Sequence, residues 1–147
     1  MDRSVALVVT VTIGAALAAQ APLNSALGRT VGGVQASVVA LGISFAALLA
    51  LCVVTGGLSG IGKLGEAPLH VAVGGGLIGA IYVGSIVWTV RALGAGGLTA
   101  ATIAGQLALA VVIDHFGWLG VARSPITAGK VFGIALLALG TWFVVRD

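Results

Sequence analysis

The stretch AALAAQAPLNSALG, residues 15–28, brings Gln20, Pro22 and Asn24 into an apolar run before any further charge. It contains two small-x-small triplets, Ala-Leu-Ala and Ala-Gln-Ala, which could form the cleavage site of a signal peptide. Alternatively, the stretch belongs to a membrane helix whose polar side chains face something other than lipid. The two interpretations predict different folds, and the rest of the chain decides between them.

The composition indicates a chain that lies in a membrane. Of its 147 residues, 59% are hydrophobic and 7% are charged, and the mean hydropathy is +1.20. A soluble domain carries roughly 25% charged residues. The net charge of +3 comes from scattered Lys and Arg residues, so no basic cluster predicts binding to nucleic acid. The single cysteine, Cys52, excludes an internal disulfide and a cysteine-rich metal site.

Long apolar runs predict an all-α integral membrane protein with five transmembrane helices in a single domain, residues 1–147. A bilayer core about 30 Å thick needs about 20 apolar residues of helix. The runs are continuous rather than alternating, which disfavours a membrane β-barrel. The predicted spans lie at about 4–27, 34–55, 69–90, 96–116 and 127–145.

We expect the first segment to be a retained helix rather than a cleaved signal peptide. Arg3 is offset by Asp2, which weakens the positive start of a signal peptide, and the apolar character continues well past residue 15. Pro22 directly after Ala21 also makes that bond a poor cleavage site. The opening stretch is therefore assigned to a membrane helix.

The positive residues give the chain almost no preferred orientation. Five spans place the two termini on opposite sides of the membrane, and an excess of Lys and Arg marks the cytoplasmic side. One side has four such residues and the other has three, namely Arg3, Lys63, Arg123 and Lys130 against Arg29, Arg91 and Arg146. Insertion in both orientations and a weak bias toward one remain open. Two oppositely inserted copies would form an inverted-topology pair, on which many transporters are built.

No motif points to catalysis, a cofactor or a metal. The loop GGLSGIGKLGE, residues 56–66, matches two glycine-rich nucleotide-binding patterns. However, it follows a membrane helix rather than a strand, and Leu64 stands where a P-loop needs Ser or Thr. His70 and His115 have no cysteine partners, and no two carboxylates stand at helical spacing. We therefore expect no enzyme activity, no cofactor and no metal site.

Amide side chains inside the predicted spans carry the most information about function. Gln20 and Asn24 are four residues apart and share one face of the first helix. Pro22 between them lacks an N–H and frees the carbonyl of Ala18, which at membrane depth needs a neighbour, water or a ligand. Gln106 lies near the middle of the fourth span. For these three amides, the lining of a cavity and contacts between helices remain equally open.

The third predicted helix has one polar face, formed by Tyr82, Ser85 and Thr89, with Trp88 beside it. These residues could line a pathway through the membrane. For the hydroxyl side chains, hydrogen bonds to their own helix or to a neighbouring helix are the favoured alternative.

Asp114 is the only acidic residue within a predicted span, and His115 follows it directly. A carboxylate near the C-terminal end of a helix faces the negative end of the helix dipole. It therefore needs a cation, such as Arg123 or Lys130. The pair could act as a gate or a proton-coupling site, but an ion-paired cap at the membrane interface is the favoured interpretation.

Several motifs resemble one family of transporters. These are AAQAPLNSALG in the first helix, GAIYVGS in the third and AGQLALAVVIDHFGW in the fourth, within a five-helix unit of this length. Over nearly the whole chain, the sequence resembles the YdcZ-like branch of the drug/metabolite transporter superfamily. The positions that match the family motifs are Gln20, Asn24, Gln106, Asp114 and His115.

The resemblance implies a multi-pass exporter of the bacterial inner membrane, with half-size members that assemble as antiparallel pairs. The partner would be an identical copy or a paralogue, and the pair would form a ten-helix inverted-repeat transporter. A midplane site for an unknown small molecule would lie among the amides and the aromatic face of the third helix. The smallest exporters of the superfamily use a glutamate in their first helix, whereas this one has only Gln20 and Asn24, which favours a neutral or weakly charged solute. A passive pore and an accessory subunit of a larger complex are the alternatives.

Overall fold

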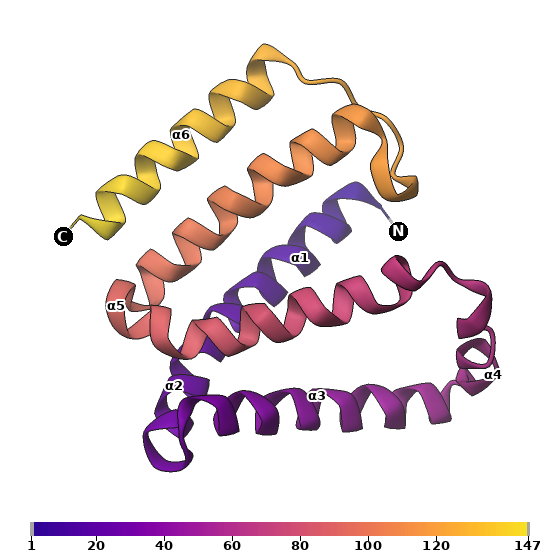
Figure 1. Ribbon diagram of the computed structural model, residues 1–147. Helices are drawn as coiled ribbons and strands as arrows, with labels where there is room; N and C mark the ends of the chain where they lie inside the picture. Colours follow the sequence, from indigo (N-terminus) through magenta and orange to yellow (C-terminus); the bar gives the residue numbers. More distant parts are fainter. Residues whose placement is uncertain (1, 147) are drawn as a thin grey trace. The chain divides into compact units, whose positions relative to one another are not determined.

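The computed structural model describes residues 2–146, and the described chain is α-helical (Figure 1). About 87% of the residues are helical, which confirms the all-α fold class. The helices are α1 (Arg3–Ala18), α2 (Gln20–Val31), α3 (Gly33–Val54), α4 (Leu58–Ile61), α5 (Leu69–Phe116) and α6 (Ala128–Val145). Short 3-10 turns lie at Leu64–Glu66 and Trp118–Gly120.

Among the described residues, four helical stretches are long and apolar enough to cross a membrane: Arg3–Val31, Gly33–Val54, Leu69–Phe116 and Ala128–Val145. The third of these has 48 residues and would be about 72 Å long as one straight helix, more than twice the thickness of a bilayer core. It is interrupted at Gly94, where φ is 68° and ψ is 170°. A residue with a side chain rarely adopts this conformation. Each of the two parts, 69–93 and 95–116, is long enough to form a span.

The first stretch consists of two helices that meet at Ala19. The N–H of Ala19 bonds to the carbonyl of Ala16 over 3.1 Å, which tightens the last turn of α1. Pro22 follows three residues later and has no N–H to continue the helical ladder. The expected span at 4–27 is therefore interrupted, and α2 continues to Val31 before Gly32, with φ 98°, ends it.

The chain forms two compact parts, residues 1–91 and 92–147, and each is described by itself. In the first part, α3 and residues 69–91 of α5 pack antiparallel, because Gly33 lies against Trp88 and Ser37 against Val83. The hydroxyl of Ser37 donates to the carbonyl of Val83 over 3.2 Å. The most deeply buried side chains of α5, Ile86 and Val87, belong to this part.

The second part consists of the end of α5 and of α6, which also pack antiparallel. A Cβ at Gly97 would lie 3.3 Å from Val145 Cγ2, so the two backbones approach closely. The hydroxyl of Thr141 donates to the carbonyl of Ala100 over 3.2 Å. None of the residues of α6 is buried within this chain.

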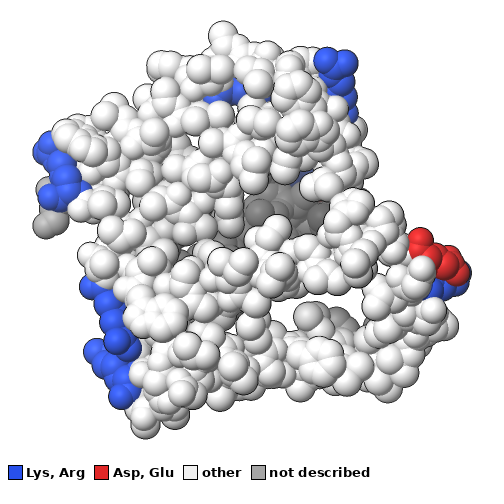
Figure 2. All heavy atoms as spheres, in the orientation of Figure 1, with Lys and Arg blue, Asp and Glu red and all other residues white. Residues whose placement is uncertain are grey.

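Most large apolar side chains are exposed on the surface of the described chain. Val54 and Leu69, for example, have 84% and 78% of their surface exposed. Figure 2 shows charged side chains only in small, separate groups on an otherwise uncharged face. Exposed apolar patches of this extent mark a surface that another apolar phase covers. The surface is that of a multi-pass membrane protein.

Candidate functional site

Gln20, Asn24 and Gln106 have no hydrogen-bond partner within the described chain, but they differ in burial. Asn24 is only 8% exposed. Its Nδ2 is the one buried side-chain nitrogen or oxygen among residues 2–146 that lacks a partner. Gln20 is half-buried and Gln106 is exposed. In hydrocarbon, an unpaired amide costs several kcal/mol, so each of these groups calls for a partner from outside the chain.

Asn24 lies on a polar face of α2, which the first part of the chain covers. The buried residues of α2 are Ala21, Asn24, Ser25 and Gly28. Small side chains at these positions let the neighbouring helix approach, and a Cβ at Gly28 would lie 3.0 Å from Val87 Cγ1. Asn24 is therefore buried on the face of α2 where small residues allow close packing, and its Nδ2 has no hydrogen-bond partner there.

Arg91, in α5, reaches the same face of α2. Its Nε donates to the hydroxyl of Ser25 over 3.2 Å, and its Nη2 donates to the carbonyl of Ser25 over 3.4 Å. Arg91 Nη2 also lies 3.6 Å from the place where a Cβ at Gly28 would stand. We call Asn24, Ser25, Gly28 and Arg91 the Asn24 site. It combines an unpaired amide donor with a guanidinium that is largely exposed.

The Asn24 site was only half predicted. Spacing and Pro22 drew attention to Asn24, but Arg91 was interpreted only as a charge that orients the chain. Arg91 and Ser25 are 66 positions apart in the sequence, and no local spacing rule connects them.

The polar residues of the predicted third span lie mostly away from this site. Ser85 donates to the carbonyl of Tyr82 over 2.8 Å, and Thr89 donates to the carbonyl of Ser85 over 3.1 Å. Their hydroxyls are thus satisfied by their own helix. Ser85 is exposed and Tyr82 is half-buried, whereas the buried face of this segment is Val83, Ile86, Val87 and Val90.

Trp88 does come near the Asn24 site through Gly33. It is 51% exposed, and a Cβ at Gly33 would lie 3.1 Å from its Cζ2 and 3.3 Å from Val87 Cγ1. Val87 in turn contacts Gly28 of the site. Trp88 is therefore separated from the site by Val87 and Gly33. Its fluorescence can serve as a signal of binding at the site.

Asp114 and His115 stand at the end of α5, where the following loop folds back. The N–H of Ser124 donates to the carbonyl of Asp114 over 2.8 Å, and Arg123 Nε donates to the carbonyl of His115 over 3.0 Å. The N–H of Ile126 donates to Nδ1 of His115 over 3.2 Å. We call this set of bonds the loop clamp.

Lys130 extends the loop clamp from α6. Its ammonium donates to the carbonyl and the hydroxyl of Ser124 over 3.1 and 2.8 Å, and to the carbonyl of Pro125 over 3.1 Å. The two expected cations thus bind other groups: Arg123 bonds to the carbonyl of His115, and Lys130 bonds to oxygens of Ser124 and Pro125. In the described residues neither forms a salt bridge with Asp114, so the end of α5 is held by hydrogen bonds to main-chain carbonyls and to the imidazole of His115 instead of by an ion pair.

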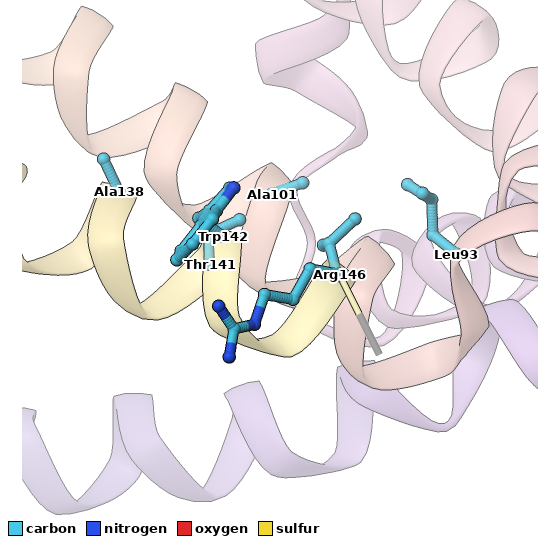
Figure 3. Close-up of a pocket in the computed structure, with 7 residues that line it drawn as sticks. Leu93, Ala101, Ala138, Thr141, Trp142 and Arg146 are labelled. Carbon is cyan, nitrogen blue, oxygen red and sulfur yellow. The ribbon is translucent and has the colours of Figure 1, made fainter.

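An apolar groove in the second part of the chain has enough room for a ligand (Figure 3). Its volume is about 490 Å³. Thr141 has already donated its hydroxyl to Ala100, and the guanidinium of Arg146 lies 4.6 Å from the centre of the Trp142 ring. The groove therefore suits a hydrocarbon chain better than a polar solute. Its lining residues are Leu93, Ala101, Ala138, Thr141, Trp142, Val145 and Arg146.

Within the described residues, no cluster of three His, Cys, Asp or Glu side chains could hold a metal ion. The chain therefore presents unpaired amides among membrane helices. These features define a multi-pass helical membrane protein.

A family model described as "Putative inner membrane exporter, YdcZ" matches residues 5–143. The chain belongs to this YdcZ family of inner-membrane exporters, as the helix motifs predicted, and it is a multi-pass protein of the inner membrane. No curated protein and no solved structure matches the chain.

Proposed function

We propose that this chain is one half of a small-molecule exporter, formed by two copies inserted in opposite orientations. The family supports export in general terms. We propose in addition that two copies pair, that each copy has five spans, and that the solute binds near Asn24.

The unpaired amide of Asn24 is the observation that carries the proposal. A buried donor without a partner costs roughly 1–3 kcal/mol. The chain could avoid that cost with an apolar side chain of similar shape. A donor kept for a solute that binds and leaves has to be unpaired in the empty protein. Asn24 Nδ2 is such a donor.

The positions of the amides suggest a path across the membrane. Gln20 stands near the middle of the Arg3–Val31 stretch and Gln106 near the middle of the expected span at 96–116. Asn24 lies one turn beyond Gln20, about 10 Å from the end of the stretch at Val31. The solute would enter at Asn24 and pass Gln20, and we assign Gln106 to the same path on the basis of its depth within its own span.

Pairing of two copies would complete this path. With Gly94 as a break, α5 supplies two spans and the chain has five, so two oppositely inserted copies make ten helices with inverted repeats. Their two Asn24 sites would lie toward opposite faces of the membrane. Small residues at every fourth position would let the copies approach closely. A Cβ at Gly42, Gly75 or Gly79 would meet nothing within 4 Å in this chain, so these positions are open to a second copy.

The other polar residues take supporting roles in this proposal. Tyr82, Ser85 and Trp88 flank the pathway, with Trp88 nearest to the solute. We assign Asp114 and His115 to the loop clamp rather than to gating or proton coupling, because their carbonyls and the His115 imidazole bond to the loop.

Replacement of Asn24 by leucine tests the proposal. Leucine has a similar branched shape and removes the unpaired donor, so Asn24→Leu should be at least as stable as the native protein in thermal unfolding. It should nevertheless abolish export. Because the solute is not specified, the assay compares by mass spectrometry the metabolites released by cells that overproduce each variant or none.

Gln35→Leu is the matched control, because Gln35 is an exposed amide at the start of α3 without a hydrogen-bond partner in the described chain. It should leave the released metabolites unchanged. Failure of Asn24→Leu to insert would show that Asn24 is structural, and unchanged release would show that it is not on the path. Release that rises linearly without saturation would indicate a pore instead of a transporter.

A further inference from the structure

We propose that the exported solute carries a carboxylate, which the amide of Asn24 and the guanidinium of Arg91 bind together. The inference rests on the proposed export and adds the chemical class of the solute. It differs from the expectation of a neutral or weakly charged solute, which rested on the absence of an acid in the first helix and did not include Arg91.

The donors of the Asn24 site are the first argument. Asn24 Nδ2 is buried and has no acceptor. A guanidinium has five N–H groups and no acceptor. Arg91 directs Nε and one N–H of Nη2 toward Ser25, so Nη1 and the second N–H of Nη2 remain without a protein partner in the described chain. The site thus offers donors and needs an acceptor.

The charge of the site is the second argument. The described chain has three acidic residues, Asp2, Glu66 and Asp114, and none of them forms a salt bridge. Arg91 donates its hydrogen bonds to Ser25, which is neutral. Close to hydrocarbon, a cation without a counter-ion is costly. A carboxylate from the solute would supply the missing charge, and it fits the forked end of a guanidinium with two parallel bonds.

The geometry allows both groups to reach one carboxylate. Asn24 and Gly28 are four residues apart, so they lie one above the other on the same face of α2. Arg91 Nη2 lies 3.6 Å from the Cβ position of Gly28 and bonds to Ser25, the neighbour of Asn24. The guanidinium of Arg91 thus lies against residues 25 and 28 of α2, within one helical turn of the buried amide of Asn24.

Direct binding to the purified protein in neutral phosphatidylcholine nanodiscs tests this inference. Trp88 serves as the fluorescent reporter, with Trp118→Phe and Trp142→Phe removing the other tryptophans. The probes are three acids, each with its uncharged amide of nearly the same shape: acetate with acetamide, lactate with lactamide, and benzoate with benzamide.

At least one acid should bind saturably, and its amide should bind about tenfold more weakly or not at all. Arg91→Gln should remove this preference, and Arg91→Lys should retain part of it, because an ammonium keeps the charge but not the fork. Arg29→Gln is the matched control, since Arg29 is an exposed arginine of α2, and it should keep the preference.

Three results would overturn the inference. The first is that no acid binds more tightly than its amide in any pair. The second is that Arg91→Gln binds as the native protein does. The third is that Arg29→Gln weakens binding as much as Arg91→Gln, which would indicate a general surface potential.

Uptake of the bound acid into proteoliposomes separates this inference from the proposed function. Binding of the acid without any uptake would contradict the exporter and leave the carboxylate site in place. Uptake of acid and amide at the same rate would support the exporter and contradict the carboxylate site.

Discussion

Hydroxyl and amide side chains behave differently within these helices. The hydroxyls of Thr10, Ser44 and Thr89 each donate to the carbonyl four residues earlier. A short hydroxyl side chain reaches that carbonyl without leaving the helix surface. The amides of Asn24, Gln20 and Gln106 find no such partner. These three amides are therefore the candidates for function, and Asn24 comes first because its unpaired nitrogen is buried.

Glycine at position 28 decides how closely α2 approaches α5, and its replacement provides a residue-scale prediction. A Cβ there would lie 3.0 Å from Val87 Cγ1, so Gly28→Ala should force the two helices apart. We expect a loss of about 1–3 kcal/mol in the free energy of unfolding, measured by SDS titration of the protein in detergent.

Gly14→Ala provides the control for this prediction, because a Cβ at Gly14 in α1 would meet nothing within 4 Å. Alanine favours a helix by up to about 1 kcal/mol over glycine, so this variant should be as stable as the native protein or slightly more stable. Equal effects of the two substitutions would show that the contact between Gly28 and Val87 does not hold the first part together.

At the scale of residues, the sequence identified features that depend on near neighbours in the chain, but not contacts between distant helices. The pattern around Pro22 drew attention to Asn24 and to a weakened helical ladder, because both depend on neighbours within one turn. Arg91 stayed unrecognised as part of the site, because its contact with Ser25 exists only after distant helices have packed. The hydroxyls of Ser85 and Thr89 were ambiguous for a similar reason, since a sequence does not show which carbonyl a hydroxyl selects.

At the scale of elements, the ends of the apolar runs were easier to predict than the joints between helices. The break expected at RALGAG, residues 91–96, contains Gly94, the one non-helical residue within α5. In contrast, α1 and α2 meet at Ala19, inside an apolar run that continues on both sides. The length of an apolar run can be read from the sequence. The tightening of the last turn of α1 before Pro22 depends on which backbone hydrogen bonds form.

The loop clamp provides a prediction at the element scale. The Nδ1 of His115 accepts from the N–H of Ile126, so His115→Phe should free residues 117–127. Loss of one hydrogen bond, about 0.5–1.5 kcal/mol, should speed tryptic cleavage after Arg123 roughly 2- to 10-fold. His115→Asn places an oxygen near the position of Nδ1, so it should be cleaved at nearly the native rate.

Cleavage rates that are equal for the native protein and His115→Phe would show that the imidazole does not hold the loop. If His115→Phe instead abolished export while the loop stayed protected, Asp114 and His115 would belong to the transport pathway after all.

At the scale of the whole molecule, the fold class followed from composition, but the assembly did not. A chain that is 59% hydrophobic and 7% charged has too few charged side chains to cover itself in water. Which surface meets lipid and which meets a second copy depends on contacts that no single sequence contains. The distribution of four positive residues against three is too even to decide the orientation.

The orientation of the chain tests the central claim most directly. Two reporters are fused after residue 147 in separate strains, one active only in the cytoplasm and one active only in the periplasm. The account predicts comparable activity from both, because the two copies of each exporter insert in opposite orientations. Activity from only one reporter would contradict a pair made of two identical, oppositely inserted chains.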